Sequence, residues 1–449
     1  MSKQRIQLSD HFTYPRLLRF VLPCIGTMLF TSIYGIVDGL CVSNFVGKTA
    51  FAAVNLIMPL PMLLGTIGFM LGTGGSAIVG ITLGEGDQKK ADRYFTLFLL
   101  AALVSVSVLA VLGIVFLRPI AVLLGAKGEL LDYAVRYGRI LMVSLPTFAL
   151  QNMFQSFFVT AEKPHLGFWF TVGAGCTNMV LDVLMVGIWG WGVEGAAIAT
   201  FISQLVGGVL PVFYFIDRSN SSRLHLCKTS FYSKVLRDAC INGSSELMTN
   251  LSMSLVNILY NYQLLRLAGE NGVAAYGVIM YAAFLFVAVL VGYAVGSAPI
   301  VSFHYGARNH AEVHNLYRKS LRLIAVVAVT LTLASMFIIP CVARIFVGYD
   351  AELLALTSRA FRLYALSFLI MGFNVYASSF FTALGDGVTS ALISFLRTLA
   401  FQVIAILLLP LLLGIDGIWL AVTAAELAAL AVSAAMLLTK DKVFHYRKA

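Results

Sequence analysis

The 449-residue sequence is poor in charge, because Asp, Glu, Lys and Arg together make up only 12% of it. A typical soluble domain carries about 25% charged residues, so these side chains are too few to cover a water-facing surface. Hydrophobic residues make up 59% of the chain, and the mean hydropathy is +0.89. The shortage of charge therefore excludes an ordinary soluble protein and predicts one that lies in a membrane.

The apolar runs also lack the residue-by-residue alternation that a membrane β-barrel needs. Stretches of roughly 20 apolar residues, such as 97–117, recur along the chain, and each is long enough to cross a ~30 Å hydrocarbon layer. Helices satisfy their own backbone hydrogen bonds where water is absent. We therefore predict an all-α membrane protein with twelve transmembrane helices. The expected spans are 16–44, 51–80, 95–117, 134–160, 166–188, 193–216, 239–266, 273–303, 321–346, 361–384, 388–413 and 416–438.

Several motifs of enzymes and metalloproteins are absent. The six cysteines have no CxxC spacing, which argues against a zinc site or a disulfide framework. No Walker A sequence is present, so ATP hydrolysis is not expected. The basic N-terminus is not followed by a short apolar core with a small-residue cleavage site, so we expect it to be retained. We predict that the chain is not an enzyme and needs no cofactor.

Positive charge is distributed unevenly along the chain. A formal net charge of +10 would suit a nucleic-acid partner. If both termini are cytosolic, however, the inside segments hold 21 Lys and Arg residues, the outside segments hold 9, and Arg397 lies within a span. This distribution follows the positive-inside rule. We therefore predict no nucleic-acid partner and a multi-pass protein of the cytoplasmic (inner) membrane with both termini in the cytosol.

The two halves of the sequence resemble each other. One constant offset places Gly84 on Gly306 and Gly192 on Gly414. A constant offset over such a distance indicates an internal repeat. Because each half holds six expected spans, both halves enter the membrane in the same orientation. The repeat axis should then lie along the membrane normal.

The longest polar stretch separates these halves. We predict an N-lobe of residues 1–216, a cytosolic linker of residues 217–237 and a C-lobe of residues 238–449. Two-lobed repeats of this kind are typical of transporters, whose substrate path lies between the repeats.

Two acids stand out inside expected spans, where an ionisable group costs about 2.5–3.5 kcal/mol. Asp38 follows Tyr34 by one helical turn and Asp182 follows Asn178 by one turn, so each pair shares a helix face. With Thr200 of the next span, these side chains offer the oxygen atoms that suit Na⁺. The same two acids, close together, could instead bind and release a proton. The alternative is a structural role, in which each acid only pairs with a hydroxyl or an amide.

This acidic group is confined to one half of the sequence. The offset that aligns the glycines places Asp38, Asn178 and Asp182 on Tyr260, Ala400 and Ile404, respectively. A device for symmetric packing would be expected in both halves. The asymmetry therefore favours a functional site in the N-lobe.

Two further acids lie in the second half. Glu246 in the seventh span could meet cationic compounds in a central cavity or bind Asn250 one turn away, and the sequence does not decide between these roles. Glu426 in the twelfth span and Arg397 in the eleventh are expected to form an ion pair. We predict that this pair is structural.

These features together resemble the multidrug and toxic compound extrusion (MATE) family, and within it the DinF-type bacterial branch. The resemblance covers essentially the whole chain. It includes two pseudo-symmetric six-helix lobes and the LGEGD and YGARN stretches after the second and eighth spans. It implies a secondary transporter that uses an ion gradient.

The resemblance also implies roles for individual residues. The positions that match the cation site of the family are Tyr34, Asp38, Tyr137, Asn152, Asn178, Asp182 and Thr200. For Na⁺ the metal ligands would be Asp38, Asn178, Asp182 and Thr200. Occupancy of Asp38 would bend the first span near Pro23. Glu246 matches an acid of other branches, whereas Asn374 stands in the span where those branches carry a second acid. The candidate lining of the substrate cavity is Glu246, Asn374, Gln151 and Met253.

The sequence thus predicts a monomeric exporter of small organic, often cationic compounds, working in exchange for H⁺ or Na⁺ by alternating access of two lobes. Its partners would be these compounds and membrane lipids. Three alternatives belong to other classes. One is a lipid-linked precursor flippase of a related fold, which would more typically carry a cationic central groove. The others are a membrane-embedded enzyme using Asp38 and Asp182 as a catalytic pair, and a channel.

Overall fold

The computed structural model describes residues 6–46, 48–348 and 350–447; the side chains of residues 39–44, 48, 51, 342, 345 and 346, with Cys41 among them, lie outside this description. The described chain is almost entirely helical. Its α-helices are α1 (Tyr14–Phe45), α2 (Lys48–Ile57), α3 (Pro59–Gly84), α4 (Gln88–Leu123), α5 (Gly128–Thr160), α6 (Pro164–Asp182), α7 (Gly192–Gly208), α8 (Leu210–Ile216), α9 (Ser233–Asn242), α10 (Ser244–Gly306), α11 (His310–Val347), α12 (Ala351–Ala365), α13 (Phe368–Ala383), α14 (Gly387–Phe395), α15 (Phe401–Leu413), α16 (Ile415–Thr439) and α17 (Asp441–Phe444). Two π-helical turns, η1 (Val183–Ile188) and η2 (Leu396–Ala400), continue α6 and α14.

Within the described ranges, nine helices or continuous helix pairs are long and apolar enough to cross a membrane. A tenth span comes from α12 and α13, which meet at a bend of 45°. The 33-residue α5 is long enough as well, although charged side chains occupy its first turns. The last of the twelve spans comes from α10, which is two helices and not one.

The chain reverses within α10. A straight helix of 63 residues would be about 95 Å long, three times the thickness of a hydrocarbon layer. Gly269 interrupts it with φ 59° and ψ −151°, a backbone conformation that residues other than glycine avoid. The rings of Tyr260 and Tyr276 stack 4.9 Å apart, which is possible only if the two segments run side by side. The prediction of twelve spans is therefore confirmed.

Several helices begin earlier than the hydropathy pattern predicted. α4 begins at Gln88 and not at 95, and α11 begins at His310 and not at 321. Asp87 and Asn309 cap them, each accepting a hydrogen bond from the backbone N–H three residues later, at 3.0 Å and 3.1 Å. These capped first turns are charged and therefore resembled loops in the sequence, although side-chain caps start a helix regardless of its polarity.

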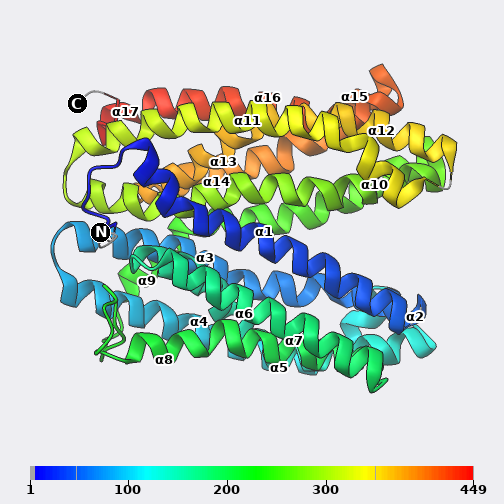
Figure 1. The fold of residues 1–449 in the computed structure, drawn as a ribbon, viewed down its shortest axis with the longest axis horizontal. Helices are drawn as coiled ribbons and strands as arrows, with labels where there is room; N and C mark the ends of the chain where they lie inside the picture. The colour runs from blue at the N-terminus through cyan, green and yellow to red at the C-terminus, as the bar shows by residue number, and fades with distance from the viewer. Residues whose placement is uncertain (1–5, 47, 349, 448–449) are drawn as a thin grey trace.

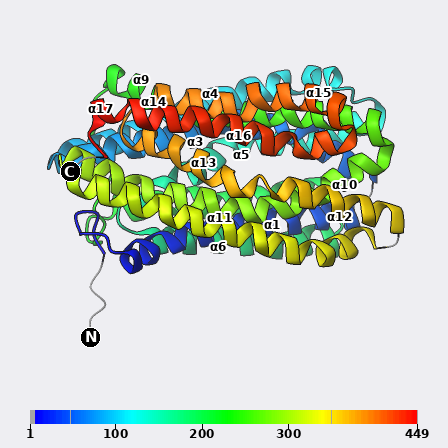
Figure 2. The ribbon, with the colours of Figure 1, turned by 90° about the horizontal axis from the view of Figure 1, so that it is seen from above.

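The helices form two groups, which correspond to the two halves of the chain. Figure 1 shows α2 to α8 in one group and α10 to α17 in the other, with α1 running along the boundary between them. The start of α1 and the last helix, α17, lie at the same end of the bundle in both views (Figures 1 and 2). The prediction of two six-helix lobes is confirmed.

The lobes meet through a reciprocal contact, which we call the seam, formed by Ile81 and Gly84 of α3 with Phe303 and Gly306 of α10. A Cβ atom on Gly84 would overlap the carbonyl oxygen of Phe303, and a Cβ on Gly306 would overlap that of Ile81. The offset between the two halves of the sequence places Ile81 on Phe303 and Gly84 on Gly306. The two contacts are therefore the same contact made in both directions. Such reciprocity is the mark of a twofold interface, and it explains why both positions are glycine.

The apolar cores show where the lobes are joined. One core contains residues of both halves and of both termini, including Phe12, Phe157, Phe380 and Tyr446. A second core lies within the C-lobe around Phe361, and two others lie within the N-lobe. The lobes are thus fused at the end that holds the termini and separate at the opposite end.

The segment before α1 ties both lobes together at this fused end. The backbone N–H of Leu8 donates to Oε1 of Glu162, which follows α5, at 2.9 Å. The N–H of Phe12 donates to Oε1 of Glu312, in the first turn of α11, at 2.8 Å. Both donors belong to fully buried residues. We call residues 6–12 the strap, because they hydrogen-bond to one lobe and then to the other.

Candidate functional site

The first candidate site lies inside the N-lobe, where α1 and α6 approach each other. Asp38 comes from α1 and Asp182 from the last position of α6, and their carboxyl groups are neighbours that can share a hydrogen bond when one is protonated. Asp182 is fully buried. The structure therefore brings together the two acids on which the prediction depends.

Two tyrosines flank this pair. Tyr34, one turn before Asp38, feels the charge of that carboxyl, and Tyr137 of α5 feels the charge of both acids. Tyr137 is almost completely buried. Asp182 and Tyr137 are buried and Asp38 is half-buried with its Oδ1 atom inside, so water screens the mutual repulsion of the two acids only weakly.

Several oxygen atoms at this site have no partner. Among the described residues, no donor reaches Oδ1 of Asp38, Oδ1 of Asn178 or either carboxyl oxygen of Asp182. Buried polar atoms are nearly always satisfied, and two adjacent carboxylates need a compensating positive charge. The donor set is made of oxygen alone, which fits a proton or a hard monovalent cation. The fourth predicted ligand, Thr200, donates its hydroxyl to the carbonyl of Ala196 at 3.0 Å, which leaves the hydroxyl oxygen able to accept.

Other predicted residues of the N-lobe lie elsewhere. Asn152 is on the same helix as Tyr137, about 22 Å further along its axis, and its Nδ2 has no partner among the described residues. Gln151 packs its side chain against Gly207 of α7 and lies in the interior of the lobe. Pro23 lies inside α1, about 22 Å from Asp38 along the helix.

The second candidate site is a pair of cavities between the lobes. The larger, of about 410 Å³, takes its N-lobe wall from the start of α3, at Pro59, Met62 and Leu63. The seam is at the other end of α3, so this cavity lies in the half of the molecule where the lobes are separate. Its volume is that of a site for a drug-sized molecule. Met253, a predicted lining residue, is in its wall.

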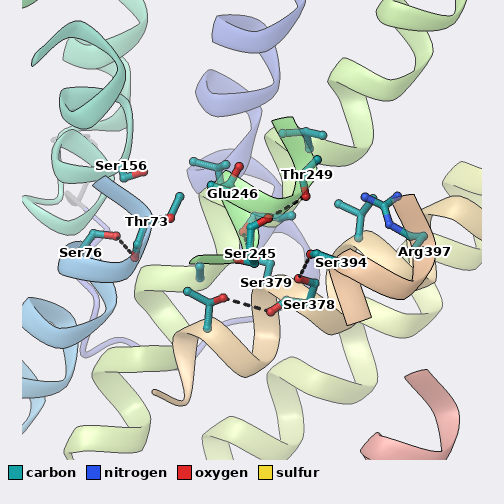
Figure 3. Close-up of a pocket in the computed structure, with 16 residues that line it drawn as sticks. Thr73, Ser76, Ser156, Ser245, Glu246, Thr249, Ser378, Ser379, Ser394 and Arg397 are labelled. Carbon is teal, nitrogen blue, oxygen red and sulfur yellow. Dashed lines mark hydrogen bonds between the residues drawn. The ribbon is translucent and has the colours of Figure 1, made fainter. Parts of the chain in front are cut away.

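Nine of the sixteen residues that line the smaller cavity, of about 110 Å³, are Ser or Thr, and they come from α3, α5, α10, α13 and α14. Glu246, also predicted, is in its wall, and Figure 3 shows its carboxyl group beside these hydroxyls. The neighbouring Asn250 donates to the backbone carbonyl of Glu246 at 2.9 Å and not to its carboxylate. The carboxyl group of Glu246 is therefore not bound by Asn250.

Asn374, the remaining C-lobe residue predicted to line the cavity, is fully buried and is in the wall of neither cavity. Its Nδ2 donates to Oε2 of Glu426 at 2.7 Å. Oε1 of Glu426 accepts a hydrogen bond from Nη1 of Arg397 at 3.2 Å. The predicted Arg397–Glu426 ion pair is therefore confirmed, and Asn374 serves it by binding the second carboxyl oxygen.

Arg397 has a position that sequence reasoning missed. Its side chain lines both cavities. Arg397 belongs to the π-helical turn η2, and the other π-helical turn, η1, directly follows Asp182. Such turns are rare and occur frequently at functional sites. Both lie in the fifth span of their lobe, each beside an ionisable residue. The charge of Arg397 within a span was visible in the sequence, but its access to the cavity depends on how the lobes pack.

The model of one protein family matches this chain twice, over residues 23–184 and 247–408. The chain belongs to the MatE family. Each match covers one half, and the starts of the two matches are separated by nearly the same offset that aligns the halves of the sequence. Proteins of this family are membrane transporters and not enzymes, so the interpretation of Asp38 and Asp182 as a catalytic pair does not apply.

Relatives of similar length are distant in sequence. Multidrug export protein MepA of Staphylococcus saprophyticus is 21% identical over 433 residues, with 95% of this chain and 94% of the relative covered. MepA of Staphylococcus aureus strain MSSA476 is 21% identical over 432 residues, with 96% and 95% covered. The fold is shared with an outward-facing multidrug resistance MATE family transporter (TM-score 0.92, 22% identity) and with a transporter of the MOP superfamily from Pyrococcus furiosus (TM-score 0.90, 22% identity), each matched over 100% of both chains.

Proposed function

We propose that this MatE-family transporter exports small organic compounds and is driven by a monovalent cation, H⁺ or Na⁺, that binds at Asp38 and Asp182. The supporting observation is the buried pair of adjacent carboxyl groups with unsatisfied oxygens and no basic partner among the described residues. A group of this kind is stable only with one positive charge added, and that charge is the coupling ion.

The transport cycle follows from the separation of the two sites. The cavities lie between the lobes, whereas the acids lie within one lobe, on α1 and α6. Because α1 runs along the lobe boundary (Figure 1), occupancy of Asp38 changes the helix that contacts the other lobe, with Pro23 as its flexible point. Opening the seam and closing the far end would then expose the cavities to the other side of the membrane. This is alternating access of an N-lobe (1–216) and a C-lobe (238–449).

One coupling ion supplies enough energy for export. A monovalent cation moving through about 150 mV releases about 3.5 kcal/mol. At about 1.4 kcal/mol for each factor of ten, this sustains a substrate gradient of about three hundredfold. A single exchange of one cation for one neutral substrate therefore needs no further source of energy.

We place the fused end of the bundle in the cytosol. The segment before α1, α17 and the linker 217–237 lie at this end (Figure 1). All the segments expected on the cytosolic side together hold 21 of the 31 Lys and Arg residues, as cytoplasmic loops do. The larger cavity would then face the outside of the cytoplasmic membrane. The two lobes with their own site and cavities are sufficient for the cycle, so we propose that the monomer is the transporting unit.

The decisive experiment is transport by purified protein in proteoliposomes. Efflux of a cationic dye is measured with a pH gradient and an Na⁺ gradient imposed separately, for the wild type, Asp38→Asn and Asp182→Asn. We expect one gradient to drive efflux in the wild type and neither gradient to drive it in the variants. Each Asn preserves the shape of the acid but removes the charge that attracts the cation.

Asp132→Asn is the matched control, because it makes the same chemical change at an exposed position of α5. It should transport like the wild type. Efflux at the wild-type rate by either variant of the buried pair, in protein that elutes as a single species, would refute the assigned role.

A further inference from the structure

Arg397 is poorly explained by its ion pair alone. Only its Nη1 forms a hydrogen bond or an ion pair with a described residue, and its Nε is buried without a partner. A guanidinium group has five N–H donors in a planar fork that matches a carboxylate. A side chain that served only Glu426 would be expected to use more of this fork. Nε is buried, whereas Nη2 has no partner among the described residues and belongs to a side chain that lines both cavities.

The charges around the cavities are arranged as two unlike centres. Arg397 and Glu426 are paired, and Glu246, an acid that forms no ion pair with a described residue, lies on the other side of the smaller cavity. Glu246 and Arg397 both line the smaller cavity, so one molecule that enters it can contact both groups. In the view of Figure 3, Thr249 stands between them. A ligand that carried only negative charge would be repelled by both acids, and one that carried only positive charge would leave the guanidinium donors unused.

We propose that Glu246 and Arg397 form a subsite for zwitterionic compounds, with the ligand's amine or iminium group at Glu246 and its carboxylate at the free N–H donors of Arg397. This inference rests on the proposed export function for the identity of the cavities as the substrate site. It adds a ligand class that the cation-coupling acids of the N-lobe do not select. A zwitterion meets each centre with the opposite charge and leaves the net charge of the cavity unchanged, which limits the cost of burying it.

The test compares two dyes that differ in one group: a zwitterionic rhodamine with a free carboxylate, and its methyl ester, which is a cation with the same ring system. Binding of each to the purified full-length protein is measured by fluorescence polarisation without any ion gradient. The variant is the double substitution Arg397→Gln with Glu426→Gln, which removes both members of the buried pair and leaves no unpaired charge. We expect its affinity for the zwitterion to fall by about tenfold or more, since hydrogen bonds to charged groups are strong, and its affinity for the ester to change by less than about twofold.

Glu246→Gln provides the contrast, because it removes the centre that both dyes share. It should weaken the binding of both. Equal losses for the two dyes in the double variant, unchanged binding of the zwitterion there, or no binding of the zwitterion by the wild type would overturn the proposal. Binding of the ester by wild type and double variant alike would show that the cavity accepts organic cations, so the export function is judged separately by the liposome experiment.

Discussion

Replacing Gly84 by alanine should shift the molecule away from the conformation seen here. In this conformation the new Cβ would overlap the carbonyl oxygen of Phe303 and lie 2.7 Å from the backbone nitrogen of Ala307. Both are backbone atoms at the end of α10 and cannot rotate aside. The seam must therefore widen, whereas a conformation with an open seam has no such contact and is unaffected.

The size of the shift follows from the cost of overpacking, which is typically about 1–3 kcal/mol for added methyl groups in a close-packed contact. This corresponds to a change of about 5- to 150-fold in the equilibrium between closed and open seam. Gly306→Ala should act in the same direction, because its Cβ would overlap the carbonyl of Ile81 in the reciprocal contact.

Cys24 provides a natural reporter of this equilibrium. It is buried, and its Sγ lies 3.1 Å from the position of a Cβ on Gly296, in the contact between α1 and α10. In a variant that retains Cys24 as its only cysteine, the rate of labelling by N-ethylmaleimide measures how often the contact opens. We expect Gly84→Ala to raise this rate by about the factor calculated above.

Gly277→Ala is the matched control, because it adds the same methyl group to α10 at a position with nothing within 4 Å. It should leave the labelling rate unchanged. If Gly84→Ala and Gly277→Ala behave alike, or if Gly84→Ala labels like the parent, then the seam is not the contact that closes this end of the molecule.

Two further predictions concern the fused end. Glu312→Gln should release the strap, because a neutral amide binds the N–H of Phe12 more weakly than a carboxylate does. Limited proteolysis should then cut residues 6–12 at least several-fold faster. An unchanged rate would mean that the strap is held by its apolar contacts alone. Asp386, which caps α14, has a pKa below its usual value of 3.8, since burial opposes ionisation but a lysine ammonium at 2.9 Å and Thr389 outweigh it. A group with a depressed pKa in the folded state contributes stability above its unfolded value and loses it in acid. The melting temperature should therefore fall below about pH 3.8 more steeply in the wild type than in Asp386→Asn, and parallel pH profiles would contradict this reasoning.

The membrane architecture was accessible from the sequence because one physical quantity determines it. The length of each apolar run must match the hydrocarbon thickness, and the break at Gly269 fell in the short gap expected between the spans 239–266 and 273–303. The helix starts at Gln88 and His310 were missed, since charged first turns outside the hydrocarbon carry no hydropathy signal. The repeat was equally visible, and its offset relates the two sides of the seam.

The candidate site was accessible only in part. Helical spacing places Tyr34 with Asp38 and Asn178 with Asp182, but the meeting of the two pairs depends on how α1 packs on α6, which spacing does not contain. Asn152 shows what a correct helix prediction leaves open. It lies on the predicted helix with Tyr137, which is beside the acids, but it is several turns further along and therefore away from them. The exposure of Arg397 to the cavities arises from the packing of the lobes and has no local signal.

The reciprocal glycine contact also bears on how such a molecule can be built and altered. A surface that meets its own copy across a twofold axis can join two separate polypeptides as well as two halves of one. A half-length chain that carried the α3 side of the seam would therefore pair with a second copy of itself in a bilayer, without the linker. Once the two copies are fused in one chain, residues outside their interface can change independently in each half. The N-lobe can then carry the acids Asp38 and Asp182, and the C-lobe can carry Arg397, while both lobes keep the same fold.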